Sequence, residues 1–237
     1  AEICKIVPGD PAAVLVIEVT GDDPAEVESR AEEMQRRVME SGVATDCLLC
    51  RDPAQAKAVW EMRNAALGLL SNIQGARKPV PYIEDAAVPL PCLASYIAEV
   101  LAVCRRHEQP VALFAHAGVG LLHVRPMHDL HQPEELAKMR RIQREVFELV
   151  RRHGGSWSGE HGDGLIRGMF NREFFGDRLY EAFQQVKRIF DPAGLMNPGK
   201  IVETPAEWTT TRYSGDYRPE RVETVFRFRE HGDVLGE

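Results

Sequence analysis

The sequence predicts an α+β fold, in which an antiparallel sheet carries its helices on one side. Two observations indicate this class. Short apolar, β-branched runs alternate along the chain with longer segments whose apolar residues recur at helical spacing. The strands expected at 111–115 and 121–124 are joined by a short Gly-rich turn, a link that only an antiparallel pair allows. Two ferredoxin-like split β-α-β lobes that share one sheet would satisfy both observations.

The first half of the chain is predicted to run strand, helix, strand, helix. The segment 12–19 is apolar and β-branched, which is typical of a buried strand. A helix that ends near Glu40 follows, because Asp23 suits its N-cap and Pro24 its first turn. The remaining elements of this half are a strand at 44–49 and a helix at 53–70.

The second half repeats this alternation. A long helix at 133–153 carries acidic residues in its first turn and basic residues in its last, which suits the helix dipole. Gly154 and Gly155 then end this helix. The other elements expected here are strands at 80–88, 111–115, 121–124 and 156–158, and helices at 93–104 and 178–190.

We expect one compact domain over residues 1–204 and a tail or linker over 205–237. The reason is that the segment after Val202 mixes Pro, Thr, Tyr and charged residues without a period. The chain opens with Ala1 rather than Met and ends without a closing element. We therefore interpret it as a middle segment of a longer protein.

Composition excludes several classes of protein. A net charge of -7 argues against a nucleic-acid partner, because phosphate binding needs a basic surface. No apolar run approaches the roughly 20 residues that span a bilayer. The 5 cysteines show no disulfide spacing, which favours free thiols and a cytoplasmic location, with a peripheral membrane position left open for the full-length protein. The lone CxxC of Cys47 and Cys50 is interpreted as core packing, because a metal site needs more soft ligands.

The first candidate site motif holds two histidines on either side of a Gly-rich turn. His116 stands at the start of this turn, and His123 lies within the strand expected beyond it. In a hairpin such residues can face one another across the pair. Converging imidazole nitrogens can bind a divalent metal, but two ligands are too few, so a third is required. Taken singly, each histidine is more often structural than a metal ligand.

The second motif is the glycine-rich stretch at 158–164, Ser-Gly-Glu-His-Gly-Asp-Gly. On a regular strand Glu160 and His161 would point to opposite faces, but the glycines could let both face one cavity. Glu160 would then complete a His-His-Glu metal site. His161 would serve as a general base, since an imidazole with an unperturbed pKa near ~6.5 suits this work at neutral pH. The residues alone support no more than a metal site with a neighbouring base.

Three further residues are candidates for ligand binding. Arg63 follows Trp60 on a mostly apolar helix, and Lys78 stands just before a strand. Both can bind a carboxylate if they line a cavity, although each is more often a surface charge. Asn197 lies in the turn that follows Asp191, whose ordinary role is structural.

Together these stretches resemble the C-terminal domain of the FAD-linked oxidases, in the vanillyl-alcohol-oxidase superfamily. This domain occurs in D-lactate dehydrogenases, glycolate oxidases and D-2-hydroxyglutarate dehydrogenases. The resemblance covers residues 10–204 and rests on five motifs in order: W-x-x-R, E-D-x-A-V-P, H-x6-H, G-E-H-G-D-G and D-P-x-x-x-x-N-P-G-K. One departure is that Val119 and Leu121 replace the Asp and Asn of the H-x-G-D-G-N-x-H pattern found in many members.

The stretch Leu-Leu-His-Val-Arg-Pro at 121–126 is similar to a subgroup of large fusion proteins. In that subgroup an FAD domain, this domain and a cysteine-rich iron–sulfur domain share one chain. The segments 212–219 and 223–226 resemble the connector of that subgroup. The resemblance thus implies an FAD held mostly by an N-terminal domain of the same full-length chain, and an iron–sulfur cluster in a downstream domain.

The resemblance also implies a role for each candidate residue. The substrate is a small D-2-hydroxy acid, oxidised to the 2-oxo acid, with an electron acceptor that the sequence does not identify. The isolated segment should be inactive and free of FAD. The implied roles are a divalent metal such as zinc on His116, His123 and Glu160, a base at His161, substrate carboxylate binding at Arg63 and Lys78, and approach to the flavin by Asn197.

Two other functions stay open. A flavin-independent metal hydrolase could use His116, His123 and Glu160. A non-catalytic module could instead use the histidines for structure alone. Hydrolysis by the chain with metal alone would favour the first, and full activity without the histidines would favour the second.

Overall fold

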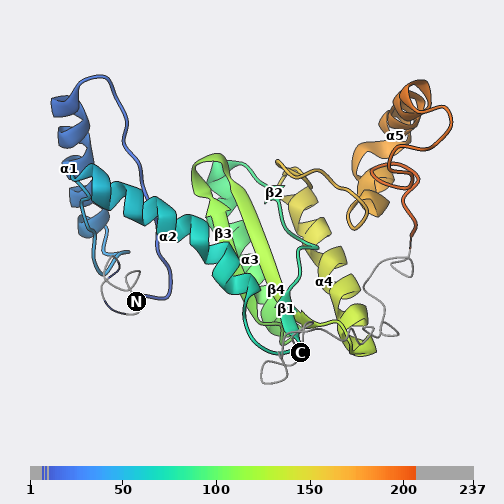
Figure 1. Cartoon of the computed structure of the whole chain (residues 1–237), viewed down its shortest axis with the longest axis horizontal. Helices are drawn as coiled ribbons and strands as arrows, with labels where there is room; N and C mark the ends of the chain where they lie inside the picture. The colour runs from blue at the N-terminus through green and yellow to red at the C-terminus, as the bar shows by residue number, and fades with distance from the viewer. Residues whose placement is uncertain (1–6, 8, 10, 207–237) are drawn as a thin grey trace, which may run out of the picture. The chain divides into compact units, whose positions relative to one another are not determined.

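The computed structural model describes residues 7, 9 and 11–206, and it divides into two compact units, one up to Asn72 and one from Ile73 onward. Figure 1 shows the helices and strands of each unit in chain order. The described residues of the first unit form two helices, and those of the second form a sheet with three further helices.

The helices of the first unit are α1 (Pro24–Glu40) and α2 (Pro53–Ser71). Both begin in the same way, with an aspartate at the N-cap and a proline in the first turn. The side chain of Asp23 accepts a hydrogen bond from the backbone N–H of Ala25 at 2.9 Å, and Asp52 does the same for Ala54. Both predicted helices are therefore confirmed.

The two strands predicted in the first unit, at 12–19 and 44–49, are absent from the described residues. A strand needs a neighbouring chain for its backbone hydrogen bonds, and neither segment has one in this part of the protein. Leu15 in the first segment is 70% exposed. The second segment contacts α1 through side chains instead, since Gln35 donates to the carbonyl of Cys47 at 2.6 Å. Cys47 and Cys50 are half-buried free thiols.

The second unit holds one antiparallel sheet built around β4 (Leu121–Asp129). Figure 1 shows β4 as the long strand beside β3, to which the tight turn connects it. Antiparallel pairing confirms the α+β class and the expected hairpin, whereas the two ferredoxin-like lobes stay a prediction. The strands that pair with β4 are β1 (Arg77–Pro79), β2 (Ala86–Ala87) and β3 (Val111–His116).

The prediction of a single strand at 80–88 was wrong. The segment between β1 and β2 does not continue the regular strand pairing with β4. Asp85 adopts a φ of 74°, a conformation that a regular strand does not contain. The segment nevertheless stays buried, and its backbone bonds to β4, for example from the N–H of Asp85 to the carbonyl of Leu122 at 3.1 Å. This irregular segment therefore carries charged side chains into the interior.

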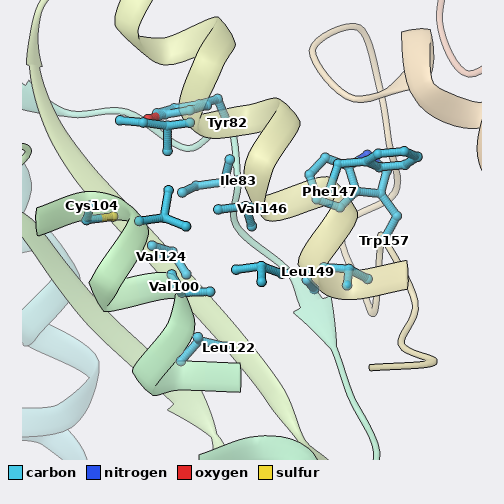
Figure 2. Packing of buried hydrophobic residues seen from close by; sticks show 14 of the residues in the cluster. Tyr82, Ile83, Val100, Cys104, Leu122, Val124, Val146, Phe147, Leu149 and Trp157 are labelled. Carbon is cyan, nitrogen blue, oxygen red and sulfur yellow. The ribbon is translucent and has the colours of Figure 1, made fainter. Parts of the chain in front are cut away.

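Helices α3 (Leu93–Arg106) and α4 (Pro133–Arg152) pack together on one face of the sheet. Figure 2 shows their apolar side chains meeting Leu122 and Val124 of β4. Burial of each such side chain contributes roughly 1.5–3 kcal/mol. Because neighbouring residues of a strand point to opposite faces, His123 points away from this core.

The last regular elements of the described part are η4 (Gly168–Phe170) and α5 (Asn171–Phe190). The helix predicted at 178–190 begins earlier, and Gly176, with a φ of 77°, kinks it. The strand predicted at 156–158 is reduced to a single bridge between Ser156 and Ala87.

Two further expectations concern the chain as a whole. Of the helices that the described residues form, none combines the length and apolar character that a membrane crossing would need. Most of the predicted tail at 205–237 lies outside the described residues, as do the connector-like segments at 212–219 and 223–226.

Candidate metal and catalytic site

The β3–β4 turn places His116 and His123 side by side. In the ladder His116 pairs with Leu121, so His123 lies two residues further along β4 and on the same face. Their rings lie 5.3 Å apart between centroids and are nearly perpendicular. The turn needs a glycine at position 120, where φ is 72° and an added Cβ would overlap the carbonyl of Val88.

The loop that carries Glu160 and His161 is anchored on the buried carboxylate of Asp85. Asp85 accepts hydrogen bonds from the hydroxyl of Ser158 at 2.7 Å, from the backbone N–H of Glu160 at 2.9 Å and from that of His161 at 3.0 Å. Burial acts to raise the pKa of Asp85, but these hydrogen bonds outweigh it and the pKa is lowered. The carboxylate thus stays charged and fixes the loop against the sheet.

Three imidazoles converge on one oxygen of Glu160. The distances from its Oε1 to the Nε2 atoms of His116, His123 and His161 are 3.6, 3.1 and 3.4 Å. His161 also stacks on His123, with ring centroids 5.2 Å apart and planes at 18°. His123 is buried, while the other three side chains are about half exposed. The cluster is therefore fixed on its inner side and open to solvent on its outer side.

The donor set of this cluster fits a divalent metal. Burial lowers the pKa of His123, which favours the neutral imidazole that a metal requires. Imidazole nitrogens and a carboxylate oxygen are the ligands that zinc takes in catalytic sites, where three protein ligands leave a position for substrate. The buried Nδ1 of His123 has no hydrogen-bond partner among the described residues. The predicted ligands His116, His123 and Glu160 are all part of this cluster, but the ligand atoms that lie within 4.8 Å of one another belong to Asp85, His123, Glu160 and His161.

A second group of charges lies directly behind the cluster. Glu84 forms an ion pair with Arg125 and contacts Nδ1 of His161 at 3.3 Å. Arg167 is buried, donates to the carbonyls of Glu84 and Gly162 and lies 3.3 Å from Asp85. Sequence reasoning missed this layer. The available signal was the Glu-Asp pair that opens the E-D-x-A-V-P motif, at the break in an apolar strand pattern.

Asp85 also lies close enough to the cluster to be considered as a metal ligand. Its carboxylate and ligand atoms of His123, Glu160 and His161 all lie within 4.8 Å of one another. Both of its oxygens, however, already accept hydrogen bonds from the loop at 158–161. We therefore assign Asp85 to anchoring the loop.

The other predicted site residues belong to other elements of the chain. Lys78 pairs with His128, five residues along β4 from His123, and its Nζ donates to the carbonyl of Ile73 at 2.7 Å. Arg63 lies in α2 of the first unit, where it is half-buried. Asn197 sits in an exposed turn, and its side-chain oxygen accepts a hydrogen bond from Lys200 at 3.1 Å.

Comparison with known proteins identifies a family whose model matches most of this chain. The model of the family described as FAD linked oxidases, C-terminal domain, matches residues 4–201. The D-2-hydroxyglutarate dehydrogenase of Escherichia coli (strain K12) is 38% identical over 192 residues, which cover 78% of this chain and 19% of the relative. The one of Pantoea ananatis (strain AJ13355) is 36% identical over 191 residues, with the same shares.

A second kind of relative is the glycolate oxidase subunit GlcD. The one of Escherichia coli (strain K12) is 32% identical over 198 residues, which cover 83% of this chain and 38% of the relative. The chain thus spans 19% of the length of these two D-2-hydroxyglutarate dehydrogenases and 38% of this glycolate oxidase subunit.

Proposed function

This chain belongs to the family of FAD-linked oxidase C-terminal domains, and we propose that it supplies the substrate site of a flavin-dependent dehydrogenase that oxidises a small D-2-hydroxy acid. The observation that carries this proposal is the convergence of three imidazoles on the carboxylate of Glu160, in a cluster open to solvent. Relatives named for D-2-hydroxyglutarate and for glycolate support the class of substrate, because both are 2-hydroxy acids.

His161 takes the proton of the substrate hydroxyl in this proposal. Its side chain is 47% exposed, so a substrate can reach it, and its Nε2 faces the cluster. Proton acceptance by a positioned imidazole typically accelerates such a step by about 10²–10⁴-fold. A bound flavin would accept the two electrons and the α-hydrogen of the substrate.

His116, His123 and Glu160 hold a divalent ion such as zinc in the proposal. Such an ion, when bound, would act as a Lewis acid that lowers the pKa of the substrate hydroxyl. The stacking of His161 on His123 keeps the proposed base beside these ligands. Because Glu160 and His161 are neighbours on one anchored loop, ligand and base are fixed together.

Three further predicted residues keep the roles that the resemblance implies. Arg63 and Lys78 bind the substrate carboxylate, as two cations of the type that recognises this group. Asn197 approaches the flavin. We also keep the proposed domain at 1–204 with its two ferredoxin-like lobes, and the linker at 205–237. In the full-length chain an FAD domain precedes the domain and an iron–sulfur domain follows it.

The proposal is tested by flavin reduction in the flavin-loaded enzyme that contains this chain. D-2-hydroxyglutarate and glycolate are mixed with it without oxygen, and bleaching of the flavin is recorded. His161→Ala should slow reduction by about 10²-fold or more with little effect on substrate affinity. The control His131→Ala removes an exposed histidine that pairs with Asp129. Equal rates in His161→Ala and the control would refute the role of His161.

A further inference from the structure

Glu84 is fixed behind His161 by contacts on both its side chain and its backbone. Its carboxylate pairs with Arg125, and both side chains are only 11–13% exposed. Its backbone carbonyl accepts a hydrogen bond from the buried Arg167. A charge this far from water is kept only where it is paired, and here Arg125 pairs with the carboxylate while Arg167 fixes the backbone. Glu84 therefore presents its second oxygen, Oε1, in one direction.

That oxygen meets Nδ1 of His161. The two atoms lie 3.3 Å apart in hydrogen-bond geometry. A carboxylate can only accept, so the proton of a neutral His161 belongs on Nδ1. Nε2 then carries the lone pair, and it faces the cluster where a substrate hydroxyl would bind.

Glu160 offers a competing arrangement, because it lies 3.4 Å from Nε2 of the same ring. That contact is an ion-pair distance rather than a hydrogen bond, and Glu160 is shared with two other imidazoles. Glu160 is also 44% exposed, whereas Glu84 is held in place. The buried, anchored acceptor should therefore decide which nitrogen carries the proton.

We infer that Glu84 is a positioning residue, which holds His161 in the tautomer with a proton on Nδ1 and leaves Nε2 free to accept the proton of the substrate hydroxyl. This inference rests on the proposed function. It assigns Glu84 no contact with the substrate. Arg125 contributes to this positioning, since it fixes the Glu84 carboxylate that orients the imidazole of His161.

The substitution Glu84→Gln tests the tautomer with little change in shape. Arg125 donates only, so the amide oxygen of Gln must face Arg125 and its NH₂ group must face His161. Nδ1 then becomes the acceptor and the proton moves to Nε2, which can no longer act as a base. We expect the rate of flavin reduction by D-2-hydroxyglutarate to fall about 10²-fold or more, as for other orienting carboxylates.

The control is Glu99→Gln, which changes an arrangement of the same kind away from the cluster. Glu99 pairs with Arg152 at 2.7 Å and with Nε2 of His153 at 2.9 Å. Its substitution should leave the reduction rate within about 2-fold of the original, since its ion-pair partners in the described part of the chain are Arg152 and His153, neither of which is a proposed site residue. Melting temperature and flavin content of both variants show whether they fold.

A second comparison separates orientation from packing. Glu84→Asp shortens the side chain but keeps a group that only accepts, whereas Glu84→Gln keeps the shape and loses that property. If Glu84 served packing alone, Gln would be tolerated better than Asp. We expect the reverse order for the reduction rate, with Asp retaining at least about 10-fold more than Gln.

A binding measurement can report the tautomer of His161 without catalytic turnover. The hydroxyl of a 2-hydroxy acid can donate to a bare Nε2, whereas the carbonyl of a 2-oxo acid needs a donor. In Glu84→Gln, 2-oxoglutarate should therefore inhibit more tightly than in the original enzyme, while the affinity for D-2-hydroxyglutarate changes little, because a hydroxyl can accept as well as donate. A collapsed site would weaken both ligands.

The outcomes distinguish this inference from the proposed function. If neither D-2-hydroxyglutarate nor glycolate reduces the flavin of the unaltered enzyme, the proposed function is wrong and the inference falls with it. If the unaltered enzyme is reduced and Glu84→Gln is as fast as Glu99→Gln, only the inference is overturned. It is also overturned if Gln outperforms Asp.

Discussion

The carboxylate of Asp85 accepts a hydrogen bond from the backbone N–H of Glu160 at 2.9 Å. This bond joins two residues 75 positions apart. It fixes the loop that carries the proposed metal ligand and the proposed base. Asp85 is fully buried and has a φ of 74°, so its backbone is held in a conformation that costs free energy. Such a residue persists where the surrounding contacts demand it.

Replacement of Asp85 by Asn should therefore destabilise the second unit. Asn keeps the size and tolerates the positive φ, but it loses a charged acceptor for several N–H groups. We expect the free energy of unfolding to fall by about 2–4 kcal/mol. Because the pKa of Asp85 is lowered in the folded state, its contribution is present above the unfolded pKa and is lost as the pH falls through the folded value.

Urea unfolding at several pH values measures this effect. The control Asp177→Asn removes an exposed aspartate that pairs with Arg172, and it should change stability by less than about 0.5 kcal/mol. The difference in the free energy of unfolding between the two variants should become smaller at acidic pH. A gap that is constant down to pH values at which the folded carboxyl is protonated would contradict the assignment.

Gly120 should tolerate no side chain. Its φ is 72°, and a Cβ added there would overlap the carbonyl of Val88. Gly120→Ala should therefore distort the hairpin that carries His116 and His123, and lower the melting temperature by several degrees or prevent folding. Gly118→Ala is the matched control in the same turn, because a Cβ there meets nothing within 4 Å. Equal stability of the two variants would show that the turn is not constrained.

The sequence was most informative where a local signal decides the structure. Asp23 and Pro24 determine how α1 begins whatever surrounds the helix, and the Gly-rich turn at Gly120 requires antiparallel neighbours. The closeness of the His116 and His123 rings followed from that turn. These features depend on residues close together in the chain.

The sequence was least informative where partners are distant. The residues around Leu15 do not show whether this segment can pair with another strand. Among the described residues it pairs with none. Asp85 and Arg167 are charged residues that ordinary patterns assign to the surface, yet both are buried because they satisfy one another and the loop at 158–162. The register that places Lys78 opposite His128 is likewise set by pairing between segments far apart in the chain.

Removal of one imidazole should weaken metal binding without unfolding the chain. His116 is 44% exposed, so His116→Ala should cost little stability, whereas zinc affinity should fall at least about 10-fold. The affinity can be measured by competition with a coloured chelator in the flavin-loaded enzyme. His131→Ala, which removes an exposed histidine paired with Asp129, should bind zinc as the unaltered enzyme does. Unchanged affinity in both variants would argue against a metal at this cluster.

A buried histidine on the opposite side of the sheet should make stability depend on pH. His128 lies between the hydroxyl of Tyr82, at 3.0 Å from Nε2, and the carboxylate of Glu135, at 2.8 Å from Nδ1. Burial lowers the pKa of His128 to about 4 in the folded state, although Glu135 acts in the other direction.

Because this folded pKa lies below the ordinary histidine value, the unfolded chain binds a proton that the folded chain does not. The free energy of unfolding should then fall as the pH drops from about 6.5 toward 4, by roughly 3 kcal/mol at most from this group. His128→Gln, which can still donate to Glu135 and accept from Tyr82, should flatten that part of the profile. His131→Gln should leave it unchanged, since His131 is half exposed. The same slope of the free energy of unfolding against pH for His128→Gln and the unaltered chain would contradict this. That result would mean that the pKa of His128 is the same in the folded and unfolded states.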